Sequence, residues 1–416
     1  MPRVLIVAQA VPPNGGSHAT RIKYFIKELA ELGWEIEILT TRIYPGTPLI
    51  DNSLQESIPS HVSFTRSFPG PLHAYAYRKK RSVSGTVKGS KKKSMKKKLL
   101  IPDTYIEWLP GALVDVFIKK KIKQKPDIIL SSAVPYTSHL IALFISKKWK
   151  TPLIADYGDP WVYDPGNPRK GVRYLIERFL ESLVISNSNI ISVTTDLTKK
   201  LYIDKYKVDP SKLKVIPMGY DKDDFSLPVP LANNEKVRFL YTGRLEPESR
   251  DANLFFLTLK KLYESGHLRQ CSFEFIGVFN RDFLDIVKNM GLDDLIKFHP
   301  WMNHRECMKY LCTADYLLLF GNNNNIQVPG KTFNYIGSGT PIIYLSNLNG
   351  EKDSVDEILK ESGTTYWKVE NSQSSIQEVL LELQSKFSYE KRNTANDLFS
   401  WKNRVKELSE IMVKLL

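Results

Sequence analysis

Short apolar runs rich in β-branched residues alternate with longer amphipathic stretches over most of the chain. Apolar runs of this length predict buried strands, and strands that alternate with helices indicate a parallel sheet covered by helices on both faces. In the first half of the chain the runs are RVLIVAQ, EIEILTT, PDIILSSA, PLIADYG and IISVTT.

A second series of the same kind follows. Its runs are VRFLYTG, SFEFIG, IKFHPW, DYLLLFG and PIIYLS, and its helical patterns include DANLFFLTLKKLYESG and RECMKYLCTA. Between the two series, the stretch LKVIPMGYDKDDFSLPVPLANNEKV loses the periodicity and accumulates Pro, Asp and Asn, which is typical of a domain boundary.

The chain ends in SWKNRVKELSEIMVKLL, which has apolar residues at helical spacing. Because this helix follows the last strand of the second half, we expect it to cross back and pack on the first half. The resulting division is a first α/β domain at 1–215, a second at 216–395 and a returning helix at 396–416. Both domains are of the doubly wound type, in which ligands bind beyond the carboxyl ends of the strands.

The bulk composition is that of a soluble globular protein of more than one domain. The chain has 416 residues, of which 42% are hydrophobic and 25% charged. We expect no membrane-spanning helix, since no apolar run approaches roughly 18 residues. The start of the chain leads directly into the first expected strand, and the three cysteines have neither a paired framework nor close metal-ligand spacing. We therefore expect a cytoplasmic protein.

The charge of the chain is strongly positive. A formal net charge of +14 points to an anionic partner, such as a nucleotide, nucleic acid or lipid headgroup. Part of the excess is local, because the stretch 78–98 holds eleven Lys or Arg residues and no acid. Two interpretations of this basic loop are open: a solvated surface loop, or a patch that attracts the anionic surface of a membrane.

Two adjacent glycines, Gly15 and Gly16, separate the first expected strand from the first expected helix. They allow a positive φ and let an anion approach the backbone at a helix N-terminus. Taken alone, the pair favours a tight surface turn over an anion site, and it lacks the G-x-G-x-x-G spacing of a dinucleotide site. Arg21, one turn into the helix, is interpreted as a surface charge.

Two carboxylates, Asp156 and Asp159, close a buried strand in the segment IADYGDPW. They lack a third ligand at metal-binding spacing, so no metal site is expected. Either residue is also suited to cap the turn that follows.

Six segments, in this order and at these separations, resemble the motif string of GT-B-fold glycosyltransferases of family 4. The resemblance covers nearly the whole chain apart from the basic loop. It implies two Rossmann-like domains that face each other across an interdomain cleft. The implied reaction is retaining transfer of a sugar from a nucleotide-sugar donor, without an essential metal. The segments are PPNGGSHATRIKYFIKELAELGWEIEILT, IADYGDPW, VIPMGYDKDDF, YTGRLEPESR, FHPWMNHRE and VPGKTFNYIGSGTPII.

The resemblance also implies roles for individual residues in donor binding. Gly15 and Gly16 approach the diphosphate and the sugar, and Gly243 precedes Arg244, which stabilises the leaving diphosphate. Where family members usually have a Lys shortly after this Arg, the nearest cation here is Arg250. Arg250 is alternatively paired with a neighbouring Asp at a helix start.

The segment VPGKTFNYIGSGTPII is expected to bind the donor through a helix N-terminus. Gly330 shapes the turn, the backbone N–H groups of Lys331 and Thr332 point toward phosphate, and Lys331 adds a charge. Family members commonly have a Glu pair here, which is missing, since the two positions fall on Asn334 and near Ile326. Asn334 is therefore expected to bind the donor ribose more weakly.

Three further site residues follow from the resemblance. Trp301 and Met302 match the segment that lies beside the nucleobase, and Asp159 lies where related enzymes place a polar residue near the sugar or the acceptor. The expected catalytic residues are thus Asp159, Arg244 and Lys331.

The resulting expectation is a cytoplasmic glycosyltransferase that acts in cell-surface polysaccharide biosynthesis. Its expected partners are a nucleotide-sugar donor and a glycan or lipid-linked acceptor, and no nucleic acid. A peripheral position on the inner face of the plasma membrane, through contact of 78–98 with anionic lipid, stays open as one of the two interpretations of the basic loop. No cofactor is expected. The alternatives are a GT-B-fold nucleotide-sugar epimerase and a catalytically silent module that binds a membrane or a partner.

Overall fold

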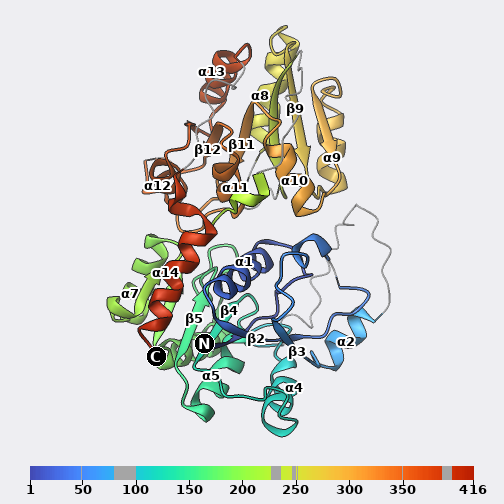
Figure 1. Ribbon diagram of the computed structural model, residues 1–416. Coiled ribbons are helices and arrows are strands. Elements are labelled where there is room, and N and C mark those ends of the chain that lie inside the picture. The colour runs from blue at the N-terminus through green and yellow to red at the C-terminus, as the bar shows by residue number, and fades with distance from the viewer. Residues whose placement is uncertain are drawn as a thin grey trace. The chain divides into compact units, whose positions relative to one another are not determined.

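The computed structural model describes residues 1–47, 49–78, 100–225, 236–245, 250, 252–348, 350–386 and 396–416. These residues form two compact units (Figure 1). The first unit comprises the described residues up to Met218 together with Trp401–Leu416, and the second comprises those from Gly219 to Ser400. Apart from Arg78, the basic loop at 78–98 lies outside the described residues.

The first unit is built on a seven-stranded parallel sheet in the order β3-β2-β1-β4-β5-β6-β7. The order reverses direction between β1 and β4, so the crossovers after these two strands leave in opposite directions. Its strands are β1 (Arg3–Val7), β2 (Glu35–Thr41), β3 (Ser63–Ser67), β4 (Ile128–Ala133), β5 (Leu153–Tyr157), β6 (Ile190–Val193) and β7 (Leu213–Val215).

Helices cover this sheet. The α-helices are α1 (Ser17–Glu31), α2 (Pro71–Tyr77), α4 (Trp108–Leu113), α5 (Thr137–Trp149), α6 (Gly171–Asn187), α7 (Asp196–Tyr206) and α14 (Trp401–Val413). Short helical segments are η1 (Asn52–Leu54), η2 (Val114–Ile118) and η3 (Pro210–Lys212).

The C-terminal helix α14 lies against α1 (Figure 1). The rings of Tyr24 and Trp401 stack with their centroids 5.2 Å apart, and the indole N–H of Trp34 donates to the hydroxyl of Ser409 over 2.8 Å. The predicted return of this helix to the first domain is therefore confirmed.

The second unit is built on a six-stranded parallel sheet in the order β10-β9-β8-β11-β12-β13, with its reversal between β8 and β11. Its strands are β8 (Val237–Thr242), β9 (Cys271–Ile276), β10 (Ile296–His299), β11 (Tyr316–Phe320), β12 (Ile342–Ser346) and β13 (Tyr366–Glu370). Its helical segments are η4 (Lys222–Phe225), α8 (Asn253–Glu264), α9 (Arg281–Lys288), α10 (His304–Leu311), α11 (Lys331–Ser338), α12 (Ser354–Ser362), α13 (Gln373–Leu383) and η6 (Asp397–Phe399).

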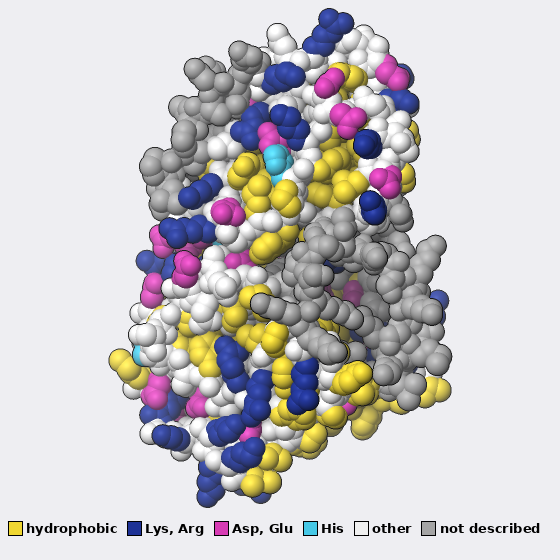
Figure 2. All heavy atoms as spheres, turned by 90° about the vertical axis from the view of Figure 1, so that its right-hand side faces the viewer, with side chains coloured by type: hydrophobic (Ala, Val, Ile, Leu, Met, Phe, Trp, Pro, Cys, Tyr) yellow, Lys and Arg dark blue, Asp and Glu magenta, His cyan; other side chains and the backbone are white. Residues whose placement is uncertain are grey.

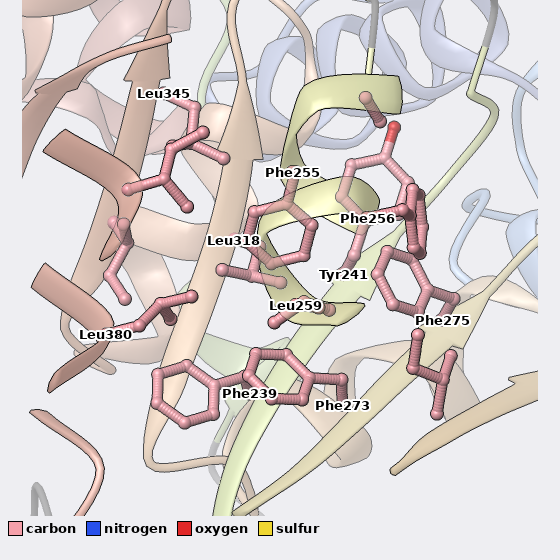
Figure 3. Close-up of a cluster of buried hydrophobic side chains, with 14 of the residues drawn as sticks. Phe239, Tyr241, Phe255, Phe256, Leu259, Phe273, Phe275, Leu318, Leu345 and Leu380 are labelled. Carbon is pink, nitrogen blue, oxygen red and sulfur yellow. The ribbon is translucent and has the colours of Figure 1, made fainter. Parts of the chain in front are cut away.

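Aromatic rings dominate the core of the second unit (Figure 3). Phe239 and Phe273 stack across β8 and β9 with centroids 4.7 Å apart, and Phe255 of α8 meets the ring of Phe273 edge-on at 5.9 Å. Offset and edge-on ring pairs of this kind add stabilisation beyond the burial of area. They hold α8 on the sheet beside the end of β8.

The first and last segments of the second unit lie next to each other. Tyr220 forms a parallel β-bridge with Ser400, its backbone N–H donates to the carbonyl of Phe399 over 3.0 Å, and its hydroxyl donates to the carbonyl of Asn396 over 3.0 Å. The chain therefore enters and leaves this unit at one place.

Both predicted parallel α/β halves are confirmed, but three strands escaped the sequence pattern. These are β3, β7 and β13, and each lies at an edge of its sheet. An edge strand is partly exposed, so β3 (SFTRS) and β13 (YWKVE) lack the continuous apolar run of a central parallel strand.

The surface has both basic and apolar areas. On the face drawn in Figure 2, Lys and Arg side chains gather close to hydrophobic ones. Within the part of the chain that the structure describes, no helix has the length and apolar character needed to cross a membrane.

Candidate functional site

The strand order of the second sheet points to a site at the carboxyl ends of β8 and β11. The chain leaves β8 at Gly243, whose φ of 116° is readily adopted only by glycine. A Cβ atom at Gly243 would also lie only 2.6 Å from Nζ of Lys331, the first residue of α11. The glycine thus lets the lysine side chain reach across the reversal point of the sheet.

The ammonium group of Lys331 is buried without an ionic partner. Nζ lies 3.7 Å from the centroid of the Tyr241 ring, and it has no hydrogen-bond acceptor within the described part of the chain. Burial, followed by the positive charge of Arg250, holds the pKa of Lys331 well below its ordinary value. A cation in such surroundings gains strongly from an anionic ligand.

Arg250 connects the two loops at the reversal point. Its Nε donates to Oδ1 of Asn322, which follows β11, over 2.7 Å, and Nδ2 of Asn322 donates to the carbonyl of Gln327 over 2.9 Å. Arg250 and Lys331 are also close enough for their charges to interact. The predicted cations of these two segments therefore come together.

The start of α11 differs in one respect from the expectation. Gly330 is the N-cap of the helix, but the backbone N–H of Thr332 donates to the carbonyl of Pro329 over 2.9 Å. The expectation that this N–H points toward phosphate is wrong, because it closes the turn. Thr332 is buried and Asn334 is half-buried in the same helix.

The other predicted donor residues lie at the same edge of the sheet. Arg244 is exposed, and its carbonyl accepts a hydrogen bond from the Tyr241 hydroxyl over 2.8 Å. Trp301, 44% exposed, and the half-buried Met302 follow β10 and precede α10. Cys307 of α10 interacts electrostatically with Lys331, so this helix borders the lysine.

The two opening glycines have different surroundings in the first unit. A Cβ atom at Gly15 would lie 2.9 Å from the carbonyl oxygen of Leu49, to which the N–H of Gly15 donates. Gly16 is the N-cap of α1 with a φ of 99°, and a Cβ atom there would meet nothing within 4 Å. Gly15 is thus required by local packing, whereas Gly16 borders open space at a helix start.

Asp159 lies beside a histidine that sequence reasoning missed. Its Oδ2 is 3.5 Å from Nε2 of His18 in the first turn of α1, and both side chains are partly exposed. Gly158 allows this approach, since a Cβ atom there would lie 3.0 Å from the imidazole ring. The carboxylate and the imidazole form a polar pair near Gly16, at the carboxyl edge of the first sheet.

The interpretation of Arg21 as a surface charge is wrong. Arg21 is fully buried, and its Nε and Nη2 donate to the two carboxylate oxygens of Asp156 over 3.0 and 2.7 Å. Asp156 also accepts from the hydroxyls of Ser132 and Ser192 over 2.8 and 2.6 Å. Asp156 is therefore a buried structural anion and not a cap or a metal ligand.

Burial alone would raise the pKa of Asp156, but Arg21 and the two serine hydroxyls outweigh it and hold this pKa below its ordinary value. Elsewhere, the described residues contain no group of three or more His, Cys, Asp and Glu side chains placed to hold a metal ion.

Two doubly wound parallel units, with a C-terminal helix that returns to the first, define the GT-B class of fold. Residues 16–219 match the family model of the glycosyl transferase 4-like domain. The match lies in the first unit, and it indicates a glycosyl transferase 4-like domain there.

Solved structures of similar fold cover the whole chain. Sucrose-phosphate synthase from Thermosynechococcus elongatus is 14% identical with a TM-score of 0.68, over 100% of this chain and 98% of that one. HepE from Anabaena, in complex with UDP, is 12% identical with a TM-score of 0.67, over 100% of both chains. UDP-GlcNAc 2-epimerase from Methanocaldococcus jannaschii is 12% identical with a TM-score of 0.58, over 100% of both chains. A search of curated proteins gives no match.

Proposed function

We propose that this glycosyltransferase-family protein transfers a sugar, with retention, from a nucleotide-sugar donor to a glycan or lipid-linked acceptor of a cell-surface polysaccharide. The donor would bind in the second unit, and the reaction would need no metal. HepE of the same fold was solved with UDP, which supports a nucleotide as ligand.

The observation that supports the proposal most is the buried cation of Lys331 next to Arg250. Its charge has no acceptor among the described residues, and it lies where doubly wound sheets bind ligands. A diphosphate supplies the missing negative charge and is suited to two neighbouring cations. We therefore assign Lys331 and Arg250 to the donor diphosphate.

The remaining roles follow the course of the reaction. Negative charge grows on the diphosphate as the sugar leaves, so Arg244 and Lys331 act most strongly in the transition state. Trp301 and Met302 would contact the base, and Asn334 the ribose. Asp159 would orient the acceptor or the sugar. The leaving diphosphate itself would take the acceptor proton, so no protein base is required.

A nucleotide panel tests donor binding directly. Thermal unfolding is measured with UDP, GDP and ADP, with wild type and with Lys331→Met as the matched variant. A nucleotide at about 100 times its Kd adds roughly 2.7 kcal/mol of stability. We expect one of the nucleoside diphosphates to stabilise the wild type and not the variant. Equal shifts for both proteins would remove Lys331 from the site.

Product analysis then separates the candidate activities. A transferase releases nucleoside diphosphate from its donor only when an acceptor is present, whereas an epimerase converts the donor without one. Binding of nucleotide without either reaction would indicate a silent module.

A further inference from the structure

Helix α6 of the first unit presents an apolar face to solvent. Val172, Leu175, Ile176 and Phe179 follow one another at helical spacing, and we call these four residues the α6 face. They are 72%, 64%, 41% and 67% exposed. Large side chains at this spacing normally face a core, and a contiguous exposed group of them marks an interaction surface.

The two acids of α6 are turned away from this face. Glu177 is buried, where it accepts from the indole N–H of Trp161 over 2.8 Å and from Nε of Arg169 over 2.9 Å. Glu181 is also buried and accepts from the Tyr202 hydroxyl over 2.7 Å. Both carboxyl groups of the helix are thus hydrogen-bonded inside the unit.

The exposed charges of α6 and of the residue before it are positive. Lys170, just before the helix, and Arg178 within it are exposed. Nη2 of Arg173 donates to the carbonyl of Leu100 over 3.3 Å, and it donates to the carbonyl of Pro102 over 2.6 Å. The start of α6 therefore lies against Leu100 and Pro102. These residues follow closely in sequence after 78–98, which holds eleven Lys or Arg residues.

We propose that the α6 face binds the surface of an anionic lipid bilayer. Its four apolar side chains would enter the boundary between headgroups and acyl chains, and the cations around it would attract anionic headgroups. This combination is the one that interfacial helices use. It does not depend on the proposed reaction, since no residue of the α6 face belongs to the donor site.

The charge also favours a bilayer over a second copy of the chain. A symmetric dimer through the α6 face would bring two basic regions together, and each chain has a formal net charge of +14. Like charges at that distance repel, whereas an anionic lipid surface is attracted.

Vesicle co-sedimentation tests the proposal with the full-length protein. The wild type is compared with Leu175→Gln/Phe179→Gln on mixed phosphatidylcholine and phosphatidylglycerol vesicles and on pure phosphatidylcholine vesicles. The matched control is Leu257→Gln/Ile286→Gln, which changes two side chains of the second unit that are 50% and 49% exposed. We expect the α6 variant to bind the anionic vesicles about tenfold or more weakly, and the control to bind like wild type.

Three results would overturn the proposal. The first is equal binding of the wild type and the α6 variant to the anionic vesicles, and the second is absence of wild-type binding to them. The third is that the wild type is a dimer in light scattering and the α6 variant is a monomer, while both bind the vesicles alike. Circular dichroism establishes that the variant is folded. Its nucleotide-induced thermal shift should equal that of the wild type, which separates failure of this proposal from failure of the proposed function.

Discussion

Replacement of Asp156 by Asn should strongly destabilise the first unit. The carboxylate is fully buried and is the only anion that faces Arg21 in the contacts of the described residues. Asn has no charge and offers a single oxygen, so Arg21 would keep its buried positive charge without a negative partner. One of its two hydrogen bonds to Asp156 would also be lost, because the NH₂ group of Asn would face an N–H group of Arg21. Breaking one side of a buried ion pair costs about 3–5 kcal/mol.

Differential scanning calorimetry measures this loss. For a unit of this size, 1 kcal/mol corresponds to roughly 2–4 °C, so the transition of the first unit should fall by about 6–20 °C. Asp209→Asn is the matched control, because Asp209 is exposed and caps only a short helical turn, and its transition should move little. The double variant Arg21→Met/Asp156→Leu should recover much of the loss, since it leaves no unpaired charge.

The sign of the pH dependence gives a further control. The pKa of Asp156 is lowered in the folded protein, so its stabilising contribution is present above the unfolded value of 3.8 and is lost as the pH falls through the lower folded pKa. The difference between wild type and Asp156→Asn should therefore be full at pH 7 and shrink below about pH 4. A drop of less than about 1 kcal/mol at pH 7 would show that Arg21 does not depend on this carboxylate.

Four further predictions concern the donor site. Without ligand, Lys331→Met should unfold at the same or a higher temperature than wild type, because it removes a buried unpaired cation. It should lose most of the stabilisation that nucleoside diphosphate gives the wild type. A folded variant that is less stable than wild type without ligand would contradict this account. The pKa of Lys331 is lowered in the free protein, and a bound anion raises it. At a pH between the pKa of the free protein and that of the bound protein, diphosphate binding should therefore take up protons. Calorimetry in buffers of different ionisation enthalpy measures this uptake, which should be absent in Lys331→Met. Arg244→Ala should lower kcat by about a hundredfold, which corresponds to about 2.7 kcal/mol in the activation barrier. Asn334→Ala should mainly raise the KM for the donor. If folded Arg244→Ala has the kcat of wild type, Arg244 does not belong to the site. Activity should persist in EDTA, and complete loss that Mg²⁺ restores would contradict a metal-independent reaction.

Sequence reasoning could predict the fold because the central strands are buried on both faces and read as continuous apolar runs. It could also name Gly243 and Lys331, since both lie in segments that resemble a known family. It could not predict that the ammonium group of Lys331 is buried without a partner. This burial depends on Tyr241 and on helix α10, which are distant from Lys331 in sequence and lie next to it only because of the order of the strands in the sheet.

The error at Arg21 has a physical reason as well. A charged residue in a helix is usually exposed, and its partner Asp156 lies on a different strand far along the chain. One signal was present, because Arg21 is spaced by four residues from Phe25 and by eight from Leu29, both buried, which places it on the inner face of α1. A single Asp in the otherwise apolar strand β5 was the matching signal. The contact between Arg250 and Asn322 had no such signal, since neither residue lies on a periodic element.

The second unit is an insertion in the first, and the bridge between Tyr220 and Ser400 holds its two ends together. The first unit is interrupted after Met218 and resumes at Trp401, and the inserted unit starts and ends on neighbouring backbone segments. Insertions with adjacent ends can be exchanged without stretching the host, as circular permutation and domain insertion show. The second unit can thus be exchanged as a whole between Met218 and Trp401, while the first unit keeps its sheet and helix α14. If the second unit binds the donor as proposed, such an exchange would change the donor and leave the first unit as it is.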